Sequence, residues 1–344
     1  MKYFNCDYNE GAYPPILRRM EETNLCQSIG YSEDGYCDEA RNIIRGLCGA
    51  SDAAVHFLVG GTQTNLTVIS AALRPHQGVI SASTGHINVH ETGAIEATGH
   101  KVLSIHTEDG LLTAEMVEKA CADHYGDEAF EHMVQPGMVY ISSPSELGTV
   151  YSRKALGDLR QVCDKYGLML YLDGARLGYG MAAAENDIDL PFLYNVCDAF
   201  YIGGTKQGAL MGEALVIRSE ALKKDFRYMI KQKGGMFAKG RLLGIQFLEL
   251  FRDGAYFKLA EHADRLADDI RRAFKAKGFK FMVNSGTNQI FVILPDDVIK
   301  KLGEKYISSD FGRYDEHHGV QRFCTSWATR PSDVEELVAD IMAL

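Results

Sequence analysis

Short apolar runs alternate with helical patterns between residues 55 and 217 of this 344-residue chain, and this alternation limits the possible folds more than any other feature. Seven of these runs have the length of buried strands: Val55–Leu58, Gly78–Ala82, Val102–Ile105, Val139–Ser142, Leu168–Leu172, Ala199–Ile202 and Ala214–Ile217. Strands that alternate with helices build βαβ units, in which the strands are parallel and helices cover the sheet. The sequence therefore predicts an α/β fold with a mostly parallel central sheet.

The clearest helix in this stretch begins after Ser152 and stops at Gly167. Its apolar residues recur at helical spacing and fall on one face, which holds Leu156, Leu159, Cys163 and Tyr166. The next run, Leu168–Leu172, is typical of a buried strand and carries Asp173 at its C-terminal end. Because ligands of open α/β sheets bind at that edge, Asp173 is a candidate site residue.

The pattern changes in the last third of the chain, where long helices such as Tyr256–Lys277 appear. Three strand candidates follow: Phe279–Val283, Gln289–Leu294 and Gln321–Ser326. Ser332 and Glu335 form a capping box ahead of a last helix, whose apolar face would hold Val334, Leu337, Val338 and Ile341. We expect a large domain of residues 1–240, including an N-terminal arm, and a smaller α+β domain of residues 241–344.

The composition is that of a soluble globular protein, with 46% apolar and 24% charged residues. A net charge of −10 argues against nucleic acid as a partner and favours a small molecule. No apolar run reaches membrane-spanning length, and the first residues lack the apolar stretch of a signal peptide, so we expect a cytoplasmic protein. The eight cysteines form neither a C-x-x-C pair nor a zinc pattern and are expected to be reduced thiols.

Lys206 lies in a glycine-rich turn directly after an apolar run, and Asp173 ends an earlier run. These two residues supply what pyridoxal phosphate requires of a protein. The lysine amine forms a Schiff base with the cofactor, and the carboxylate keeps its pyridine nitrogen protonated. Either motif alone is explained as well by a surface lysine in a turn or by an aspartate that caps a helix. Together they favour the cofactor.

Gly60, Gly61 and Thr62 follow a predicted strand and precede an apolar stretch that is typical of a buried helix. A glycine turn that opens a helix offers free backbone N–H groups and the positive end of the helix dipole, which suit a phosphate. The motif is neither a Walker loop nor a G-x-G-x-x-G fingerprint, so an ordinary strand-to-helix turn is the better explanation of this motif taken alone.

His86 and His90 follow another predicted strand. A histidine at this position can lie flat against an aromatic cofactor and can also move protons. The His-x-x-x-His spacing would also suit a metal, but Glu91 does not complete an H-E-x-x-H motif, so we predict no metal site. A structural role for His90 stays open. No G-x-S-x-G elbow and no cysteine in a nucleophile context is present.

The order and spacing of these blocks resemble the threonine aldolase group of fold-type I pyridoxal phosphate enzymes, which are related to the β-eliminating lyases. The resemblance covers nearly the whole chain, through Cys6-Asp7, residues 31–34, Gly60–Thr62, Gly85-His86 with Glu91, Asp173–Arg176, Thr205-Lys206 and Arg322. It implies a fold of the fold-type I, transferase-like kind. It also implies that Lys206 binds the cofactor covalently, Asp173 contacts the pyridine nitrogen and His86 stacks on the ring. The phosphate would then be surrounded by Gly60, Gly61, Thr62 and Thr205.

On the substrate side, the resemblance implies that Arg176 lies near the cofactor's phenolic oxygen and the substrate carboxylate, which Arg322 also holds. Cys6 and Tyr31 are expected beside the substrate. The resemblance further implies a homotetramer built as a dimer of dimers, with each site completed across a dimer interface. Tyr31 and residues 233–241 are the stretches expected to reach into a neighbouring subunit.

The activity that the resemblance implies is retro-aldol cleavage of L-threonine, L-allo-threonine or a related β-hydroxy-α-amino acid such as phenylserine to glycine and an aldehyde. Three departures lie on the substrate side. Asn5 and Cys6 replace the family's arginine and serine, Ser145 replaces a histidine that assists at the β-hydroxyl, and Phe237 replaces a common arginine. The missing histidine leaves open a β-eliminating lyase or an aminotransferase. A scaffold without cofactor is a third alternative, against which the presence of both Lys206 and Asp173 argues. Also open are the base, for which His86, His90 and a water are candidates, the stereopreference at Cβ and a structural cation.

Overall fold

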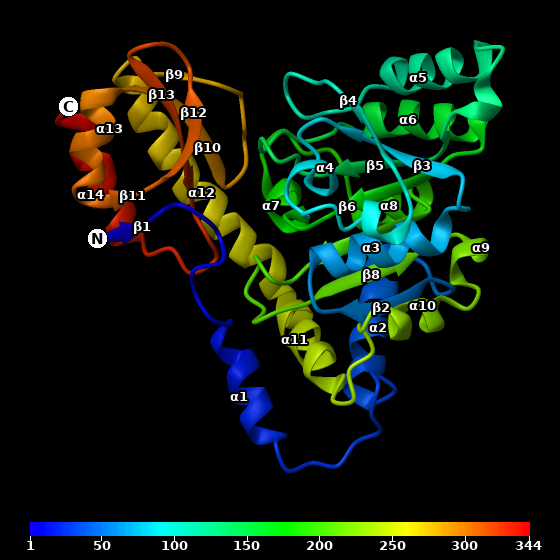
Figure 1. Ribbon diagram of the computed structural model, residues 1–344. Helices are drawn as coiled ribbons and strands as arrows, with labels where there is room; N and C mark the ends of the chain where they lie inside the picture. The colour runs from blue at the N-terminus through cyan, green and yellow to red at the C-terminus, as the bar shows by residue number, and fades with distance from the viewer.

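The computed structural model describes residues 1–344 and is built around a seven-stranded sheet in the order β2-β8-β7-β6-β5-β3-β4 (Figure 1). Its strands are β2 (Ala54–Leu58), β3 (Gln77–Ala82), β4 (Val102–Ile105), β5 (Gln135–Ser142), β6 (Met169–Asp173), β7 (Ala199–Gly203) and β8 (Glu213–Ile217). Only β8 runs antiparallel to its neighbours. The predicted α/β fold with a mostly parallel sheet is confirmed.

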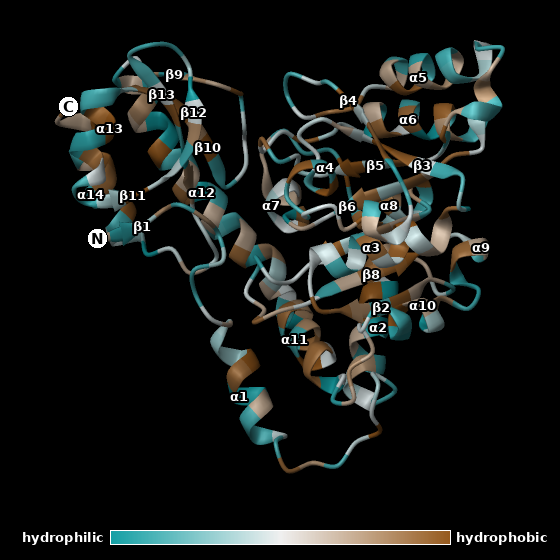
Figure 2. Cartoon of the chain, in the orientation of Figure 1, coloured by the Kyte–Doolittle hydropathy of each residue, from teal (hydrophilic) through white to brown (hydrophobic).

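Helices cover both faces of this sheet, which explains why its strands are almost continuously apolar. One face packs against α2 (Gly35–Cys48), α5 (Ala114–Gly126), α6 (Arg153–Tyr166), α8 (Leu190–Val196) and α11 (Arg241–Phe251). The other packs against α3 (Gly61–Ala72), α4 (His86–Val89), α9 (Glu220–Lys223) and α10 (Phe226–Gln232). Figure 2 shows the central strands as apolar and the outward faces of α5 and α6 as polar.

The connection through α6 forms as its sequence predicts. Ser152 caps the first turn, since its Oγ accepts a hydrogen bond of 3.1 Å from the Ala155 N–H. Gly167 ends the helix in the left-handed conformation, with φ at 65°, where a side chain would be strained. β6 then begins within two residues and ends at Asp173, so the carboxylate lies at the C-terminal edge of the sheet.

The C-terminal part forms a second, antiparallel sheet in the order β12-β13-β10-β9. Its elements are α12 (Ala255–Ala276), β9 (Lys280–Phe281), β10 (Gln289–Pro295), α13 (Asp296–Gly303), β11 (Tyr306–Ile307), β12 (Ser309–Arg313), β13 (His318–Cys324) and α14 (Pro331–Met342). The sequence did not predict β12, because its residues are mostly exposed and polar. The 3₁₀ turns η1 (Glu96–Thr98), η2 (Phe130–His132) and η3 (Arg252–Gly254) and helix α7 (Leu177–Ala182) complete the chain beyond its N-terminal arm.

The predicted capping box at the last helix is wrong. Helix α14 begins two residues earlier than the capping box implies, at Pro331, and its N-cap residue is Arg330, which makes no side-chain capping bond. Proline suits the first helical position because its missing N–H would be unpaired there in any case. Ser332 therefore lies inside the first turn. The apolar face is confirmed: Val334, Leu337 and Ile341 are buried, and Val338 packs beside them.

An N-terminal arm links the two sheets. Strand β1 (Lys2–Tyr3) pairs in parallel with β11 beside the C-terminal sheet, and α1 (Pro14–Glu22) lies along α11 (Figure 1). The boundary at residue 240 stays a prediction, and α11, which follows it, packs against α2 of the first part of the chain. No helix combines the length and the apolar character needed to cross a membrane.

Candidate active site

Three neighbouring strands of the central sheet point a tyrosine to the same face. Tyr140 on β5, Tyr171 on β6 and Tyr201 on β7 occupy equivalent positions of the two-residue strand repeat and are all buried. The Tyr140 hydroxyl donates to Asp173 Oδ2 at 2.6 Å, and the Tyr201 hydroxyl donates to Oδ1. These strands therefore build a hydroxyl cluster around the predicted aspartate.

Asn65, the fifth residue of α3, completes this cluster. Its amide nitrogen donates to Asp173 Oδ2 at 3.0 Å and to Glu91 Oε1 at 2.7 Å, and its oxygen accepts from Tyr171 at 2.9 Å. Burial alone would raise the pKa of Asp173, but the charge of His86 and the hydrogen bonds from Tyr140, Tyr201 and Asn65 lower it below its usual value. Asp173 is thus a buried carboxylate that is kept ionised.

His86 is held at the start of α4 by the same network. Its Nδ1 donates to Glu91 Oε1 at 2.7 Å, which fixes the ring orientation. Burial lowers the pKa of His86, but the Glu91 hydrogen bond and the charge of Asp173 outweigh it, so the pKa is raised. The His90 ring lies 5.6 Å from that of His86 and is exposed. The structure therefore connects His86 with Asp173 through Asn65 and Glu91.

Lys206 follows β7 in the predicted glycine turn. Its Nζ lies 5.9 Å from the ring centroid of Tyr8, and its backbone oxygen accepts a hydrogen bond of 2.6 Å from Tyr179. Burial, with the charge of Arg176 next in size, lowers the pKa of Lys206. An amine whose pKa is lowered has a larger neutral fraction, and the neutral form is the one that attacks a carbonyl carbon.

Thr205, beside the lysine, is held within its own turn. Its hydroxyl donates to Glu213 Oε1 at 2.9 Å and accepts from the Gly212 N–H at 3.1 Å. The Gly204 N–H donates to the other oxygen of Glu213 at 3.0 Å. Burial raises the pKa of Glu213 to about 8. The Thr205 hydroxyl therefore shapes the lysine turn, and its role at a phosphate stays a prediction.

The glycine turn before α3 has the properties predicted for an anion site. Gly60 is the N-cap, α3 starts at Gly61, and no side chain caps the first turn, which includes Thr62. A Cβ atom on Gly61 would lie 3.0 Å from the Tyr201 hydroxyl, so only a glycine fits without displacing that side chain. Because Asn65 is on the same helix, the uncapped N–H groups lie one turn from the Asp173 cluster.

Arg176 lies at the N-terminus of α7 and makes a bidentate ion pair with Asp7 of the N-terminal arm. Its Nε and one terminal nitrogen lie 2.6 Å and 3.0 Å from the two Asp7 oxygens. Asn288 donates to Asp7 at 2.9 Å. Burial would raise the pKa of Asp7, but the charges of Arg176 and Lys206 lower it to about 2. The guanidinium predicted near the substrate is therefore already paired.

Arg322 on β13 approaches the site from the C-terminal sheet. One terminal nitrogen donates to the Asn5 backbone oxygen at 2.8 Å, and the guanidinium lies 5.0 Å from the centre of the Phe311 ring. Its Nε is buried without a partner. Cys6 is buried beside Asn5, and its Sγ donates to Asn9 at 3.1 Å. Arg322 thus retains a free donor, which a carboxylate could use.

Tyr31 is not brought to this site within the chain. It lies in the segment between α1 and α2, is 45% exposed, and packs beside Lys231, whose Nζ is 5.1 Å from its ring centroid. Its backbone oxygen accepts a bond of 3.3 Å from Arg227. The role predicted for Tyr31 therefore depends on a second subunit.

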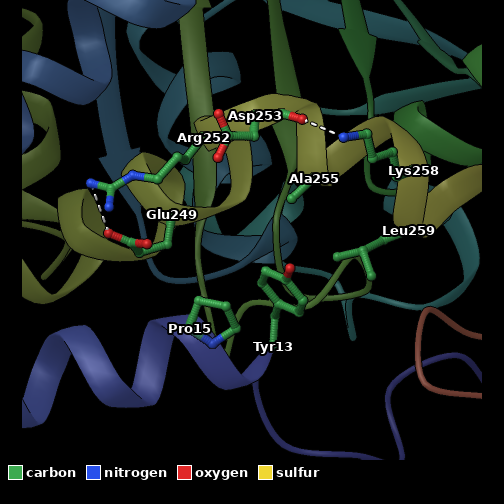
Figure 3. A pocket seen from close by; sticks show the side chains of 8 residues that line it. All are labelled: Tyr13, Pro15, Glu249, Arg252, Asp253, Ala255, Lys258 and Leu259. Carbon is green, nitrogen blue, oxygen red and sulfur yellow. Dashed lines mark hydrogen bonds and ion pairs between the residues drawn. The ribbon is translucent and has the colours of Figure 1, made fainter.

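A separate surface pocket is lined by residues at the start of α1 and from α11, η3 and α12 that belong to none of the predicted site positions: Tyr13, Pro15, Glu249, Arg252, Asp253, Ala255, Lys258 and Leu259 (Figure 3). Its charged groups bind one another. Arg252 lies 3.1 Å from Glu249, and Lys258 donates to the Asp253 backbone oxygen at 2.8 Å. The cluster around Asp173 and Lys206 is therefore the stronger candidate.

The residues of this cluster fit pyridoxal phosphate. An ionised buried carboxylate, an amine of lowered pKa and an uncapped helix N-terminus would hold the pyridine nitrogen, the aldehyde carbon and the phosphate respectively. Sequence reasoning missed Asn65, Tyr140, Tyr201 and also Glu146, whose Oε1 accepts a hydrogen bond of 2.8 Å from the His86 backbone N–H. Asn65 follows the glycine motif closely, so the sequence could have identified it as a candidate. The tyrosines could not be identified, because they are ordinary members of apolar strands.

Comparisons with known proteins agree with this geometry. The fold is that of fold-type I pyridoxal phosphate enzymes: an aspartate aminotransferase variant from Thermus thermophilus aligns with a TM-score of 0.72 at 16% identity, over 99% of this chain and 91% of that one. The model of the beta-eliminating lyase family matches residues 15–294, and the chain belongs to that family.

Two relatives match over nearly their whole length. A threonine aldolase structure from Leishmania major aligns with a TM-score of 0.97 at 40% identity, over 100% of this chain and 99% of that chain. A low-specificity L-threonine aldolase from a Pseudomonas species is 29% identical over 99% of this chain and 97% of its own. The resemblance to the threonine aldolase group is thereby confirmed.

Proposed function

We propose that the protein is a pyridoxal phosphate-dependent carbon–carbon lyase that cleaves L-threonine, L-allo-threonine or a related β-hydroxy-α-amino acid to glycine and an aldehyde. The observation that carries this proposal is the buried, ionised Asp173 in one cluster with His86 and near Lys206. The full-length similarity to threonine aldolases of Leishmania major and a Pseudomonas species supports the substrate class.

Each residue has a distinct task in this proposal. Lys206 bonds to the cofactor, Asp173 keeps the pyridine nitrogen protonated, and His86 supports the ring. When bound, pyridoxal phosphate supplies the electron sink for the Cα–Cβ bond pair. Tyr140 and Tyr201, on two different strands, both donate hydrogen bonds to Asp173. The carboxylate is therefore already in position, and it does not have to move during the reaction.

At the other end of the site, Arg322 binds the substrate carboxylate and has one unpaired donor, Nε, while Arg176 is held by Asp7 of the N-terminal arm. A planar guanidinium fork matches a carboxylate better than an ammonium group does. Cys6 is next to the Asn5 oxygen that holds Arg322 and takes the place of the family's serine. These residues fix the orientation of the amino acid, and orientation decides which bond of Cα is cleaved.

The decisive experiment incubates the purified protein, loaded with pyridoxal phosphate, with a panel of β-hydroxy-α-amino acids and measures glycine. We expect glycine and the matching aldehyde in equal amounts. Glycine from none of them would refute the aldolase activity, and ammonia or a keto acid without glycine would favour β-elimination or transamination. Borohydride reduction followed by mass spectrometry should add one cofactor to the wild type and none to Lys206→Ala.

The proposal includes a cytoplasmic homo-oligomer, a dimer of dimers in which each site is completed across a dimer interface. The segment between α1 and α2 exposes large apolar side chains, including Leu25 at 92% and Ile29 at 71%. Phe237, in the stretch 233–241, is also exposed. Such surfaces are typical of subunit interfaces. Light scattering of the wild type and of Ile29→Asp would test this, with a smaller assembly expected for the variant.

A further inference from the structure

The loop after β5 replaces the family's β-hydroxyl histidine with Ser145, and Ser145 cannot take over its task. Its side chain is 1% exposed. Its Oγ bonds to the Thr149 hydroxyl and lies 3.3 Å from the Asp109 backbone oxygen. These contacts hold the hydroxyl within its own loop. No hydrogen bond joins Ser145 to the network around Asp173.

The next residue, Glu146, bonds to the site instead. Its Oε1 accepts hydrogen bonds from the Ser142 hydroxyl at 2.7 Å and from the His86 backbone N–H at 2.8 Å. Both bonds are to the same oxygen, and Oε2 makes none. The carboxylate is thereby fixed beside the residue proposed to stack on the cofactor, with one oxygen left for a ligand.

The hydroxyl groups of Ser142 and Tyr140 lie between Glu146 and Asp173, and each donates to the nearer carboxylate. Ser142 Oγ lies 3.2 Å from the Tyr140 hydroxyl, which donates to Asp173 Oδ2 at 2.6 Å. Burial raises the pKa of Glu146, and the charge of Asp173 adds to this. A carboxyl group whose pKa is nearer to neutrality takes up and releases a proton more readily at the pH of the cell.

We propose that Glu146 is the catalytic acid–base residue that takes the proton of the substrate β-hydroxyl. The proposal rests on the proposed function. The hydroxyl proton moves to Glu146 Oε2, and the O–H electron pair forms the C=O bond of the departing aldehyde. The Cα–Cβ bond breaks, its electron pair remains with the amino-acid fragment, and Cα gains a proton to give glycine. Glu146 then releases its proton, so one proton is taken and one returned.

His90 is the competing group. It is exposed, and its ring lies 5.6 Å from that of His86. Partial burial and the charges of His86 and Arg322 lower its pKa, so its ring is neutral and able to accept a proton. The structure favours Glu146, because its carboxylate is held by two hydrogen bonds whereas no hydrogen bond fixes the His90 side chain. A base must be positioned before its pKa matters.

The test compares two reactions of the cofactor-loaded enzyme. Cleavage of L-threonine needs a base at the β-hydroxyl, whereas exchange of the glycine Cα proton with deuterium in D₂O, followed by NMR, does not. Glu146→Gln keeps the size and the hydrogen bonds of the side chain. We expect it to lower kcat for cleavage by about 10²- to 10⁴-fold. Glycine exchange, the visible absorption of the bound cofactor and the thermal midpoint of the apoprotein should stay at wild-type values.

Ser145→Ala is the matched control, and it should cleave threonine as the wild type does. Glu146→Asp, which keeps a carboxylate, should retain more activity than Glu146→Gln. This second variant distinguishes loss of the carboxylate from misfolding of the protein. Equal losses of cleavage and exchange in Glu146→Gln would overturn the proposal, and so would normal cleavage. Loss of cleavage in His90→Asn alone would assign the proton to His90. If the wild type exchanges glycine but cleaves no β-hydroxy amino acid, the proposed function itself fails and Glu146 has no such role.

Discussion

The two ends of the candidate site are built in different ways. At the cofactor end, three adjacent strands and α3 surround Asp173 with donors, and both of its oxygens are satisfied. At the substrate end, Arg322 comes from the other sheet, is held by a backbone oxygen and keeps a buried nitrogen unpaired. The cofactor end is therefore complete before any ligand binds, whereas the substrate end is completed by the ligand and, in our proposal, by a second subunit.

The largest expected effect is at Asp7, which is bonded to Arg176 and Asn288 at the substrate end. Asp7→Asn leaves Arg176 buried without its partner, and we expect the free energy of unfolding at neutral pH to fall by about 3–5 kcal/mol. Urea unfolding would measure it. Asp123→Asn, which removes an exposed ion pair with Lys119 on α5, is the control and should change little.

The same ion pair predicts a pH dependence. The folded pKa of Asp7, about 2, is below its ordinary value of 3.8, so its contribution is complete above about pH 4 and is lost as the pH falls towards 2. The stability difference between the wild type and Asp7→Asn should therefore shrink over that interval. A difference that grew on acidification would contradict the ion pair.

The next effect tests the completeness of the cofactor end. Asp173→Asn keeps the shape but removes the charge, and we expect kcat for glycine release to fall by about 10²- to 10³-fold. Tyr171→Phe is a matched control, because it removes a hydroxyl that holds Asn65 and leaves the Asp173 charge in place. Near-equal activities of Asp173→Asn and Tyr171→Phe would show that the reaction does not depend on the negative charge of Asp173.

A smaller effect is expected at the substrate end. Arg322→Lys keeps the charge and loses the planar fork, so KM for the amino acid should rise about 10- to 100-fold, the equivalent of one charge-assisted hydrogen bond. Steady-state kinetics measure this, and kcat and cofactor absorption should change much less. An unchanged KM would place carboxylate binding elsewhere.

The smallest effect concerns Cys6, at a position where the family has a serine. Cys6→Ser introduces a stronger hydrogen-bond donor beside Arg322, and KM should fall by about 2- to 10-fold, the net effect of one neutral hydrogen bond. A higher KM in the serine variant would mean that the thiol itself fits the natural substrate, and the proposed contact would then be wrong.

The sequence predicted the central sheet well because a parallel strand buried on both faces leaves an apolar run. It failed at β12, an exposed edge strand, and at α14, where Pro331 sets the start ahead of the serine. Lys206, Asp173 and His86 were predicted from their motifs, and the structure connects two of them, Asp173 and His86, through Asn65 and Glu91. Asn65, Tyr140 and Tyr201 were not predicted, because their part in the site depends on which strands are adjacent, and Glu146 was hidden by the alignment of Ser145 with the histidine.

The N-terminal arm has a mechanical consequence. At one end β1 pairs with β11, and the Phe4 backbone oxygen accepts a bond of 2.7 Å from Cys324 at the end of β13. A few residues later Asp7 is bonded to Arg176 of the central layer. A displacement of the C-terminal sheet would therefore be carried along the backbone of the arm to Asp7 and through its ion pair to Arg176. The arm thus connects the C-terminal sheet with the central sheet. A deletion of its first seven residues would remove the pairing with β11 and the Asp7–Arg176 ion pair together.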